Sequence, residues 1–194
     1  MSRRDDIIAA AIRLTERSNP GEATLSVRAV AREAGVGAST LRHYFPTQAD
    51  LHEEIARSVM DVSIKDFAIT DSALDPGQRL FECCAQLLPN HEHRDLQLET
   101  WLTIHLNALG PERREVPARL LDHAHDVTYD CLRRWLDILA SEGHLDPAEV
   151  GPASIALFTM LDGLALHSII TPDRITIDVT HEQLRWMIDR ILHR

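Results

Sequence analysis

The side chains best suited to chemistry lie in one short stretch near the start of the chain. Ser39, Thr40, Arg42 and His43 fall within five residues, and each can hydrogen-bond or carry positive charge. Such side chains pair with base edges and phosphate oxygens. The chain contains no Gly-x-Ser-x-Gly elbow, no His-Glu-x-x-His pair and no phosphate-cradling glycine loop. This stretch therefore predicts binding, and we expect the chain not to be an enzyme.

A glycine turn precedes these polar residues. Gly35-Val36-Gly37 separates two short segments of helical periodicity, one beginning near Ser26 and the other running from about Ala38 to Tyr44. Gly35 allows the left-handed conformation that ends the first helix, and Val36 is small enough to fill the gap between the helices. The pair has the form of a helix-turn-helix, whose second helix enters the major groove of DNA while the first braces it.

Apolar residues predict how the second helix is held. Leu41, Tyr44 and Phe45 are expected to anchor it from beneath, which leaves the four polar side chains facing outward. An amphipathic helix over residues 4–18 precedes the pair and supplies an apolar stripe for it to pack against. The small unit therefore has enough apolar surface to hold a helix on its outside.

Helical periodicity continues along the rest of the chain, and period-two alternation never persists. A fourth helix begins at Thr47, whose hydroxyl can cap it while Asp50 bonds back in a capping box, and it continues toward Phe67. Ile175-Thr176-Ile177 is the best strand candidate, although a linker fits it better. Five further helices are predicted at 76–88, 94–108, 112–142, 148–170 and 180–193. The fold class is all-α, with about nine helices.

The charge is distributed unevenly. The net charge of −10 argues at first against DNA, because affinity for DNA begins with the neutralisation of phosphates. Residues 1–50, however, carry seven Arg against six acids, while residues 51–194 carry thirteen Lys and Arg against twenty-four acids. The acidity therefore lies in residues 51–194, and residues 1–50 can still contact DNA.

The stretch Thr24–Leu51, TLSVRAVAREAGVGASTLRHYFPTQADL, closely resembles the signature of TetR-family transcriptional regulators. The resemblance implies a regulator with a helix-turn-helix DNA-binding domain at 1–50 and a domain for ligand binding and dimerisation at 51–194. It also implies contacts with the phosphates, the groove and the flanking backbone of a DNA operator. We expect the regulator to be a repressor, with an activator as the alternative. By position these contacts fall to Ser26 and Arg28 for phosphates, Ser39, Thr40, Arg42 and His43 for the groove, and Tyr44 and Thr47 for the backbone. Gln48 stands where most members carry a phosphate-holding Lys, so nonspecific binding should be weaker.

The last two helices carry surplus apolar surface. The segment Ile155–Ile170 is apolar nearly all round, so it must be covered on more than one side. Packing it and the last helix against their symmetry mates would form a four-helix interface, which the family resemblance also implies. We expect a homodimer, whose two reading helices would lie about 34 Å apart over the half-sites of a pseudo-palindrome.

The segment Leu161–Leu166, with the linker containing Pro172 that follows it, looks like the BetI-type subgroup of TetR regulators, which implies a small-molecule effector. Aromatic faces and a carboxylate are what a desolvated ammonium requires, so the residues permit a cation. The ligand candidates are Trp101, His105, Tyr129, Phe158 and Asp162, with Trp135 and Glu99 nearby. The alternative is that the aromatics are plain core and Asp162 is a satisfied buried acid.

The remaining residue types predict neither a metal nor another cofactor. Cys83, Cys84 and Cys131 fit neither a disulfide framework nor a zinc knuckle, and they are expected to be reduced and buried. His123 and His125 point to different sides of a helix, and His91-Glu92-His93 is more commonly a solvated loop than a metal site. No apolar run is long enough to suggest a membrane span, so we expect a cytoplasmic protein. A helical adaptor whose helix-turn-helix binds protein remains the alternative to a DNA reader.

Overall fold

The computed structural model of the chain describes residues 2–17, 26–89, 94–111 and 115–192. Over these residues the backbone forms nine α-helices and one turn of 3-10 helix, and it contains no strand, which confirms the all-α class. The helices are α1 (Arg3–Arg17), α2 (Val27–Glu33), α3 (Ala38–Tyr44), α4 (Gln48–Ser63), α5 (Pro76–Ala85), α6 (Arg94–Leu109), α7 (Glu115–Ser141), α8 (Val150–Ile170) and α9 (Ile177–Leu192), with the 3-10 turn η1 at Pro147–Glu149.

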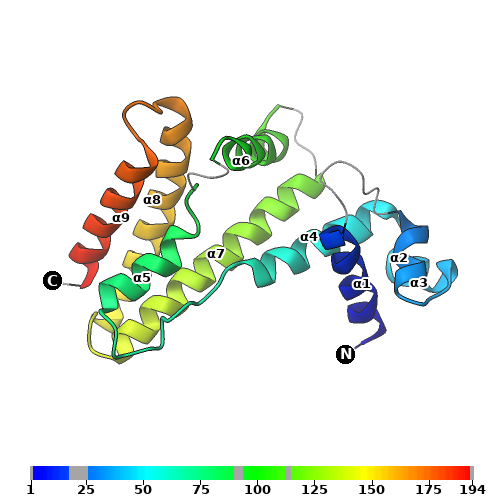
Figure 1. Cartoon of the computed structure of the whole chain (residues 1–194), viewed down its shortest axis with the longest axis horizontal. Helices are drawn as coiled ribbons and strands as arrows, with labels where there is room; N and C mark the ends of the chain where they lie inside the picture. Colours follow the sequence, from blue (N-terminus) through cyan, green and yellow to red (C-terminus); the bar gives the residue numbers. More distant parts are fainter. Residues whose placement is uncertain (1, 18–25, 90–93, 112–114, 193–194) are drawn as a thin grey trace.

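The helices gather around two main hydrophobic cores (Figure 1). A small third cluster of Ala108, Ala118 and Leu121 lies between α6 and α7. At one end, α1, α2 and α3 pack with the start of α4 around a small core that includes Ile7, Val30 and Leu51. At the other end, α5, α7, α8 and α9 share a larger core that includes Leu132 and Leu157. The long helix α7 runs between the two ends and packs against α4, so α4 and α7 connect the two cores.

Helix α4 is shorter than its apolar pattern predicts. It ends at Ser63, and Phe67 lies in the following linker with a positive φ of 40°. The side-chain amide of Gln86 explains this early end, because it accepts from the backbone N–H of Lys65 and donates to the Lys65 carbonyl, both at 2.7 Å. These bonds replace the ones that a longer helix would have made.

Two charged side chains, Arg79 and Asp66, hold the linker between α4 and α5 in place through hydrogen bonds. The buried guanidinium of Arg79 donates to the carbonyl of Ile69 at 2.6 Å and pairs through two nitrogens with Glu142. Asp66 accepts from the indole N–H of Trp135 at 2.6 Å, which lowers the pKa of that carboxyl. The structure therefore places Trp135 in the core as an anchor for the linker, and not beside a cavity.

The last helix begins earlier than expected, at Ile177. The hydroxyl of Thr176 accepts from the backbone N–H of Val179 at 3.3 Å, which supports the first turn. Ile177 is buried inside this helix. The strand candidate around Thr176 is therefore a helix start, as local capping by a Thr side chain favours.

The expectation that no apolar run is long enough for a membrane span is wrong for the segment around α8. Pro147–Ile170 has the length and composition of a membrane span, with a mean hydropathy of 1.6. In the fold it packs against α7 and α9, which bury one side of it. The opposite side carries Ile155 and Ile170 exposed to the surroundings. The excess hydropathy of α8 is thus divided between the core and an uncovered face.

Candidate nucleic-acid interface and ligand cavity

Helix α3 lies on the outside of the small core with its polar side exposed. Leu41 and Phe45, one turn apart, are 0% and 2% exposed and fix its underside. Ser39, Thr40, Arg42 and His43 are all exposed, as the sequence predicts. A free, polar helical surface of this width fits the major groove of B-form DNA.

Tyr44 does not anchor α3 from beneath. Its side chain is 37% exposed, and its ring meets His43 edge-on with 5.3 Å between centroids. Leu41 and Phe45 lie on the buried side, which leaves Tyr44 at the border of the exposed surface. This position is compatible with the contact to the DNA backbone that the family resemblance implies.

The turn between α2 and α3 has the geometry that its glycines predict. Gly35 has a φ of 63°, a left-handed conformation that L side chains rarely adopt. Ser26 caps α2, because its hydroxyl accepts from the backbone N–H of Ala29 at 3.2 Å. Thr47 and Asp50 form the expected capping box at the start of α4. Local bonds thus fix both ends of the helix pair.

Four of the candidate DNA contacts meet in one surface depression. Ser26 and Arg28 approach it from the start of α2, Arg42 from α3, and Gln48 from the start of α4. Two guanidinium groups, a hydroxyl and an amide together suit an anion such as a phosphate. Gln48 contributes a neutral amide to this depression.

The support beneath α3 includes one ion pair. Arg4 of α1 pairs with Glu54 of α4 at 2.8 Å, and its guanidinium lies 5.6 Å from the centre of the Phe45 ring. Helices α1 and α4 therefore hold the end of α3 from two sides.

A cavity of about 190 Å³ lies among α4, α6, α7 and α8. Its walls are mostly aliphatic, with one benzenoid ring and four polar side chains. The aliphatic lining consists of Met60, Leu87, Ile104, Leu120, Leu121, Ala124, Leu161 and Ala165; the others are Phe158, His105, His125, Thr128 and Asp162. An apolar pocket with a few converging polar groups is the usual form of a small-molecule site.

The polar groups of this cavity are electrostatically coupled. Burial raises the pKa of Asp162, while the neighbouring His125 and His105 pull it back down. The two imidazoles lie 5.9 Å apart between ring centroids, and His125 meets Phe158 edge-on at 5.2 Å. A partly buried carboxylate therefore faces the cavity beside two imidazoles.

The structure brings three of the five sequence-predicted ligand residues to the cavity: His105, Phe158 and Asp162. Tyr129 lies against Phe158 with 6.4 Å between ring centroids, behind the lining. The side chain of Trp101, on α6, lies outside the described part of the chain, as does that of Glu99. Three of the candidates thus come together from two helices, α6 and α8.

Sequence reasoning missed His125 as a lining residue. It lies four positions after Leu121 on α7, and this spacing puts both residues on the same side of the helix. His123 points elsewhere and pairs with Asp61 of α4 at 2.8 Å, so the expectation that His123 and His125 face different sides is correct. The helical spacing from Leu121 was the signal available in the sequence.

Helix α7 lines the cavity and also contacts α4. Arg119 donates to both carboxylate oxygens of Glu53 on α4, at 2.9 and 2.7 Å. These bonds lower the pKa of Glu53, whose side chain is mostly buried. Met60, two turns along α4, lines the cavity. An occupant of the cavity would therefore contact the two helices that connect the cores.

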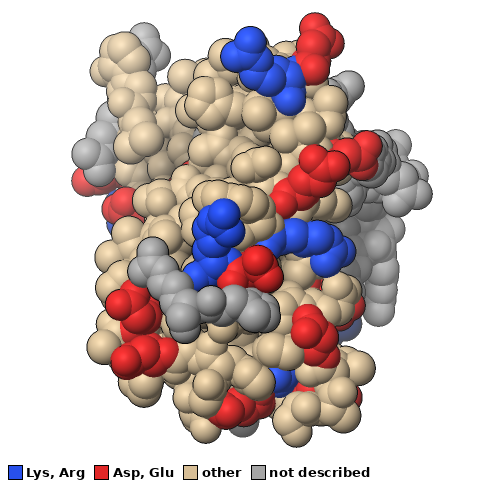
Figure 2. Space-filling view, turned by 90° about the vertical axis from the view of Figure 1, so that its left-hand side faces the viewer, with Lys and Arg blue, Asp and Glu red and all other residues tan. Residues whose placement is uncertain are grey.

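Helices α8 and α9 present an uncovered apolar face. On α8, Ile155 is 56% exposed, and Leu166 and Ile170 are exposed on the same side; on α9, Trp186 is exposed. We call these four residues the α8–α9 face. Figure 2 shows that broad areas without charge cover much of this side of the molecule. Exposed apolar surface of this kind marks an interaction site.

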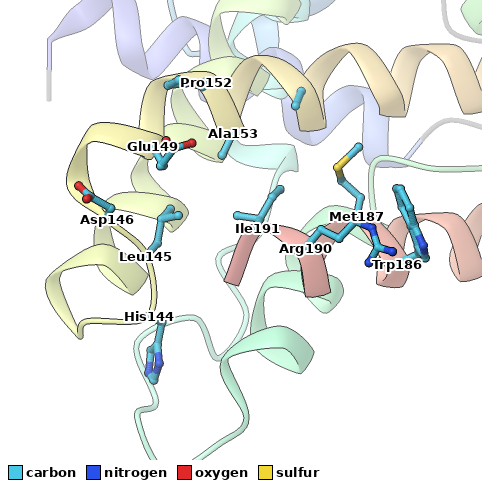
Figure 3. A pocket seen from close by; sticks show the side chains of 11 residues that line it. His144, Leu145, Asp146, Glu149, Pro152, Ala153, Trp186, Met187, Arg190 and Ile191 are labelled. Atoms are coloured by element: carbon cyan, nitrogen blue, oxygen red, sulfur yellow. The ribbon is translucent and has the colours of Figure 1, made fainter. Parts of the chain in front are cut away.

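A hollow of about 380 Å³ borders this face, between the start of α8 and the end of α9 (Figure 3). Pro152 and Ala153 line it from α8, and Met187 and Trp186 from α9. The guanidinium of Arg190 lies 4.0 Å from the centre of the Trp186 ring. The hollow is continuous with the α8–α9 face through Trp186, so the two form one surface.

Comparison with known protein families shows which family the chain belongs to. Residues 76–193, more than half of the chain, match the family of the BetI-type transcriptional repressor, C-terminal, and residues 7–55 match the bacterial regulatory proteins of the tetR family. The chain belongs to the TetR family of transcriptional regulators. Its C-terminal part is of the BetI type, as the sequence resemblance predicted.

This TetR-family chain resembles other transcriptional regulators in sequence and in fold. It is 29% identical over 157 residues to the HTH-type transcriptional regulator PksA of Bacillus subtilis (strain 168), covering 79% of this chain and 73% of PksA. A crystal structure from Pseudomonas aeruginosa PAO1 is 25% identical, with a TM-score of 0.56 over 97% of this chain and 89% of the other. A regulator from Saccharomonospora viridis, solved in complex with choline, has the same fold at 20% identity, with a TM-score of 0.61 over 98% of both chains.

The cysteines of this TetR-family chain are buried and free. Cys83, Cys84 and Cys131 all lie in the larger core, as expected. Burial raises the pKa of Cys83 to about 12 and also raises that of Cys84. Within the described residues no three His, Cys, Asp or Glu side chains group as metal ligands. The loop His91-Glu92-His93 lies outside the described residues.

The raised pKa of Asp162 predicts an effect on stability. Because the folded state favours the protonated carboxyl, the contribution of Asp162 to stability is fully present below its ordinary pKa of 3.8 and is lost as pH rises through the raised value. The variant Asp162→Asn keeps the shape and removes the charge. We expect it to unfold at the same temperature as the unaltered protein or higher at neutral pH, in thermal unfolding followed by circular dichroism.

Glu53→Gln is the matched control for this measurement. The pKa of Glu53 is lowered, so the ionised carboxylate stabilises the fold above its ordinary pKa of 4.5, and this variant should unfold at a lower temperature at neutral pH. A marked loss of stability in Asp162→Asn would show instead that Asp162 is a structural acid with satisfied partners.

Proposed function

We propose that the chain is a cytoplasmic repressor that binds a pseudo-palindromic operator as a homodimer and leaves it when a small molecule occupies the cavity. The observation that carries this proposal is the exposed polar side of α3 above a buried Leu41 and Phe45. Family membership supports the regulator role, since the TetR match covers the helix-turn-helix at residues 7–55.

The DNA contacts divide into two groups. Ser39, Thr40, Arg42 and His43 would read base edges, because they are the polar side chains on the exposed side of α3. The others would hold the phosphate backbone and set the register without reading sequence. These backbone contacts are Ser26, Arg28, Tyr44, Thr47 and Gln48.

The α8–α9 face supports a homodimer. Its apolar side chains would be covered by the same face of a second copy, as a two-fold axis requires. Two α3 helices would then lie about 34 Å apart, one turn of DNA, and would read two half-sites. The acidic C-terminal part would lie away from the DNA in this arrangement.

We infer release from the DNA from the two helices that both line the cavity and connect the two cores, α4 and α7. An effector contacting His125 on α7 and Met60 on α4 would favour one spacing of the two reading heads. Operator DNA must then weaken effector binding by the same factor, since coupling is reciprocal. The carboxylate of Asp162 favours a cationic effector. The choline bound to the Saccharomonospora protein belongs to that protein, and the likeness to it concerns the fold alone.

Arg42→Ala tests the DNA reader. The operator is first selected from a random duplex pool with the purified protein, and affinity is then measured by fluorescence anisotropy. Loss of the guanidinium should cost about 1–3 kcal/mol and relax the base preference at one position of each half-site. The control is Arg133→Ala on α7, whose guanidinium is exposed and pairs with Asp137 four residues on.

The two arginine variants separate the proposal from its alternatives. Both should remain dimeric, and Arg133→Ala should bind the operator like the unaltered protein. If the unaltered protein selects no duplex, the helix pair serves a protein partner instead. If both variants lose affinity equally, the effect is one of net charge and α3 does not read bases.

Ile155→Glu tests the dimer interface. A carboxylate buried at a two-fold interface has no partner, so the dimer dissociation constant should rise at least about tenfold. Leu106→Glu is the control, since Leu106 on α6 is 63% exposed and lies outside the α8–α9 face. Sedimentation equilibrium compares the two. Unchanged dimerisation of Ile155→Glu would place the interface elsewhere.

A further inference from the structure

The cavity among α4, α6, α7 and α8 receives hydrogen-bonding side chains from three helices. His105 comes from α6, His125 and Thr128 come from α7, and Asp162 comes from α8. A carboxylate oxygen and a neutral imidazole nitrogen both accept hydrogen bonds from an N–H group. Because these acceptors lie on different walls, they can act on one bound group together.

The charge of the described lining is one-sided. Asp162 is its acidic residue, and no Lys or Arg contributes to the walls that the structure describes. Ionising a partly buried carboxyl is costly, and His125 and His105 offset only part of that cost at Asp162. A cationic ligand beside Asp162 would offset more of it. The lining therefore predicts a positively charged ligand, but it does not by itself say which kind of cation.

Aromatic content distinguishes two types of cation. A quaternary ammonium has no N–H group and is held by several aromatic faces around it. In the described lining, Phe158 is the one benzenoid ring, and its ring is in edge contact with His125 and Tyr129 at interplanar angles of 85° and 88°. The described walls therefore offer acceptors for N–H donors more than a cage of faces.

The volume limits the size of the occupant. The cavity measures about 190 Å³. An engineered apolar cavity of about 150 Å³ accommodates benzene. The occupant therefore has roughly five to eight heavy atoms unless the helices move apart.

We propose that the effector is a small protonated amine, held by its N–H groups between Asp162 and His125, and that quaternary ammonium ions bind less well. This inference rests on the proposed function for the role of the cavity. It narrows the effector from any cation to one that donates hydrogen bonds and is close to benzene in size.

Three probes of the same heavy-atom number and nearly the same shape separate the contributions. The tert-butylammonium ion has charge and N–H groups, tetramethylammonium has charge alone, and tert-butanol has neither charge nor N–H groups. Isothermal titration of the operator-free protein should give tert-butylammonium at least about tenfold tighter than tetramethylammonium, because charge-assisted hydrogen bonds are the stronger ones. We expect tert-butanol to bind more weakly than either ion.

Substitutions in the cavity test which residues cause the preference for tert-butylammonium over the other two probes. Asp162→Asn should remove the advantage of both ions over tert-butanol. His125→Phe replaces an acceptor with an aromatic face and should narrow the ratio between the two ions. His123→Phe is the matched control, since His123 pairs with Asp61 outside the cavity and its replacement should leave the ratio unchanged.

The outcomes separate this inference from the proposed function. Tetramethylammonium binding as tightly as tert-butylammonium, or no binding of the amine, overturns the inference while operator selection can still succeed. Operator selection that fails while the amine binds as expected overturns the regulator proposal and leaves the chemistry of the cavity in place. If His123→Phe and His125→Phe change the ratio of the affinities for tert-butylammonium and tetramethylammonium equally, the change comes from the fold as a whole. That outcome overturns the role of His125.

Discussion

The burial of Leu41 and Phe45 is the constraint on which the rest of this structure depends. Leu41 lies on α3, and Phe45 directly follows the last residue of α3, one turn further along. Both side chains pack into the small core with α1, α2 and α4. Since they fix one side of a helix seven residues long, the polar residues on its other side must face outward. The exposed surface is thus a consequence of packing beneath it, and the left-handed Gly35 lets the chain turn into that position.

Helix α7 connects this reading surface to the cavity. On one side of α7, Arg119 forms an ion pair with Glu53 of α4, and His123 lies within hydrogen-bond distance of Asp61 of α4. On another side, His125 lines the cavity. The two carboxylates differ in environment, because the Glu53 side chain is largely buried and that of Asp61 is exposed. A ligand that shifts α7 therefore acts on α4 through polar contacts of known position.

Local rules made much of the helix-turn-helix predictable from sequence. The cap at Ser26, the capping box at Thr47 and the turn at Gly35 depend on residues a few positions apart, and all are confirmed. Features that depend on distant contacts were not predictable. Gln86 ends α4 early through bonds across twenty-one positions, and Arg79 pairs with Glu142 across sixty-three. Trp135 lies in the core, as the plain-core alternative predicts, but the bond from its indole N–H to Asp66, sixty-nine positions away, has no signal in the sequence.

The central claim, that α3 reads the major groove, is tested most directly by methylation interference on the selected operator. Guanine N7 lies in the major groove, and adenine N3 lies in the minor groove. The account predicts that N7 methylation blocks binding in two half-sites about one helical turn apart, while N3 methylation between them has little effect. Interference from adenine N3 alone, or from neither, would contradict it.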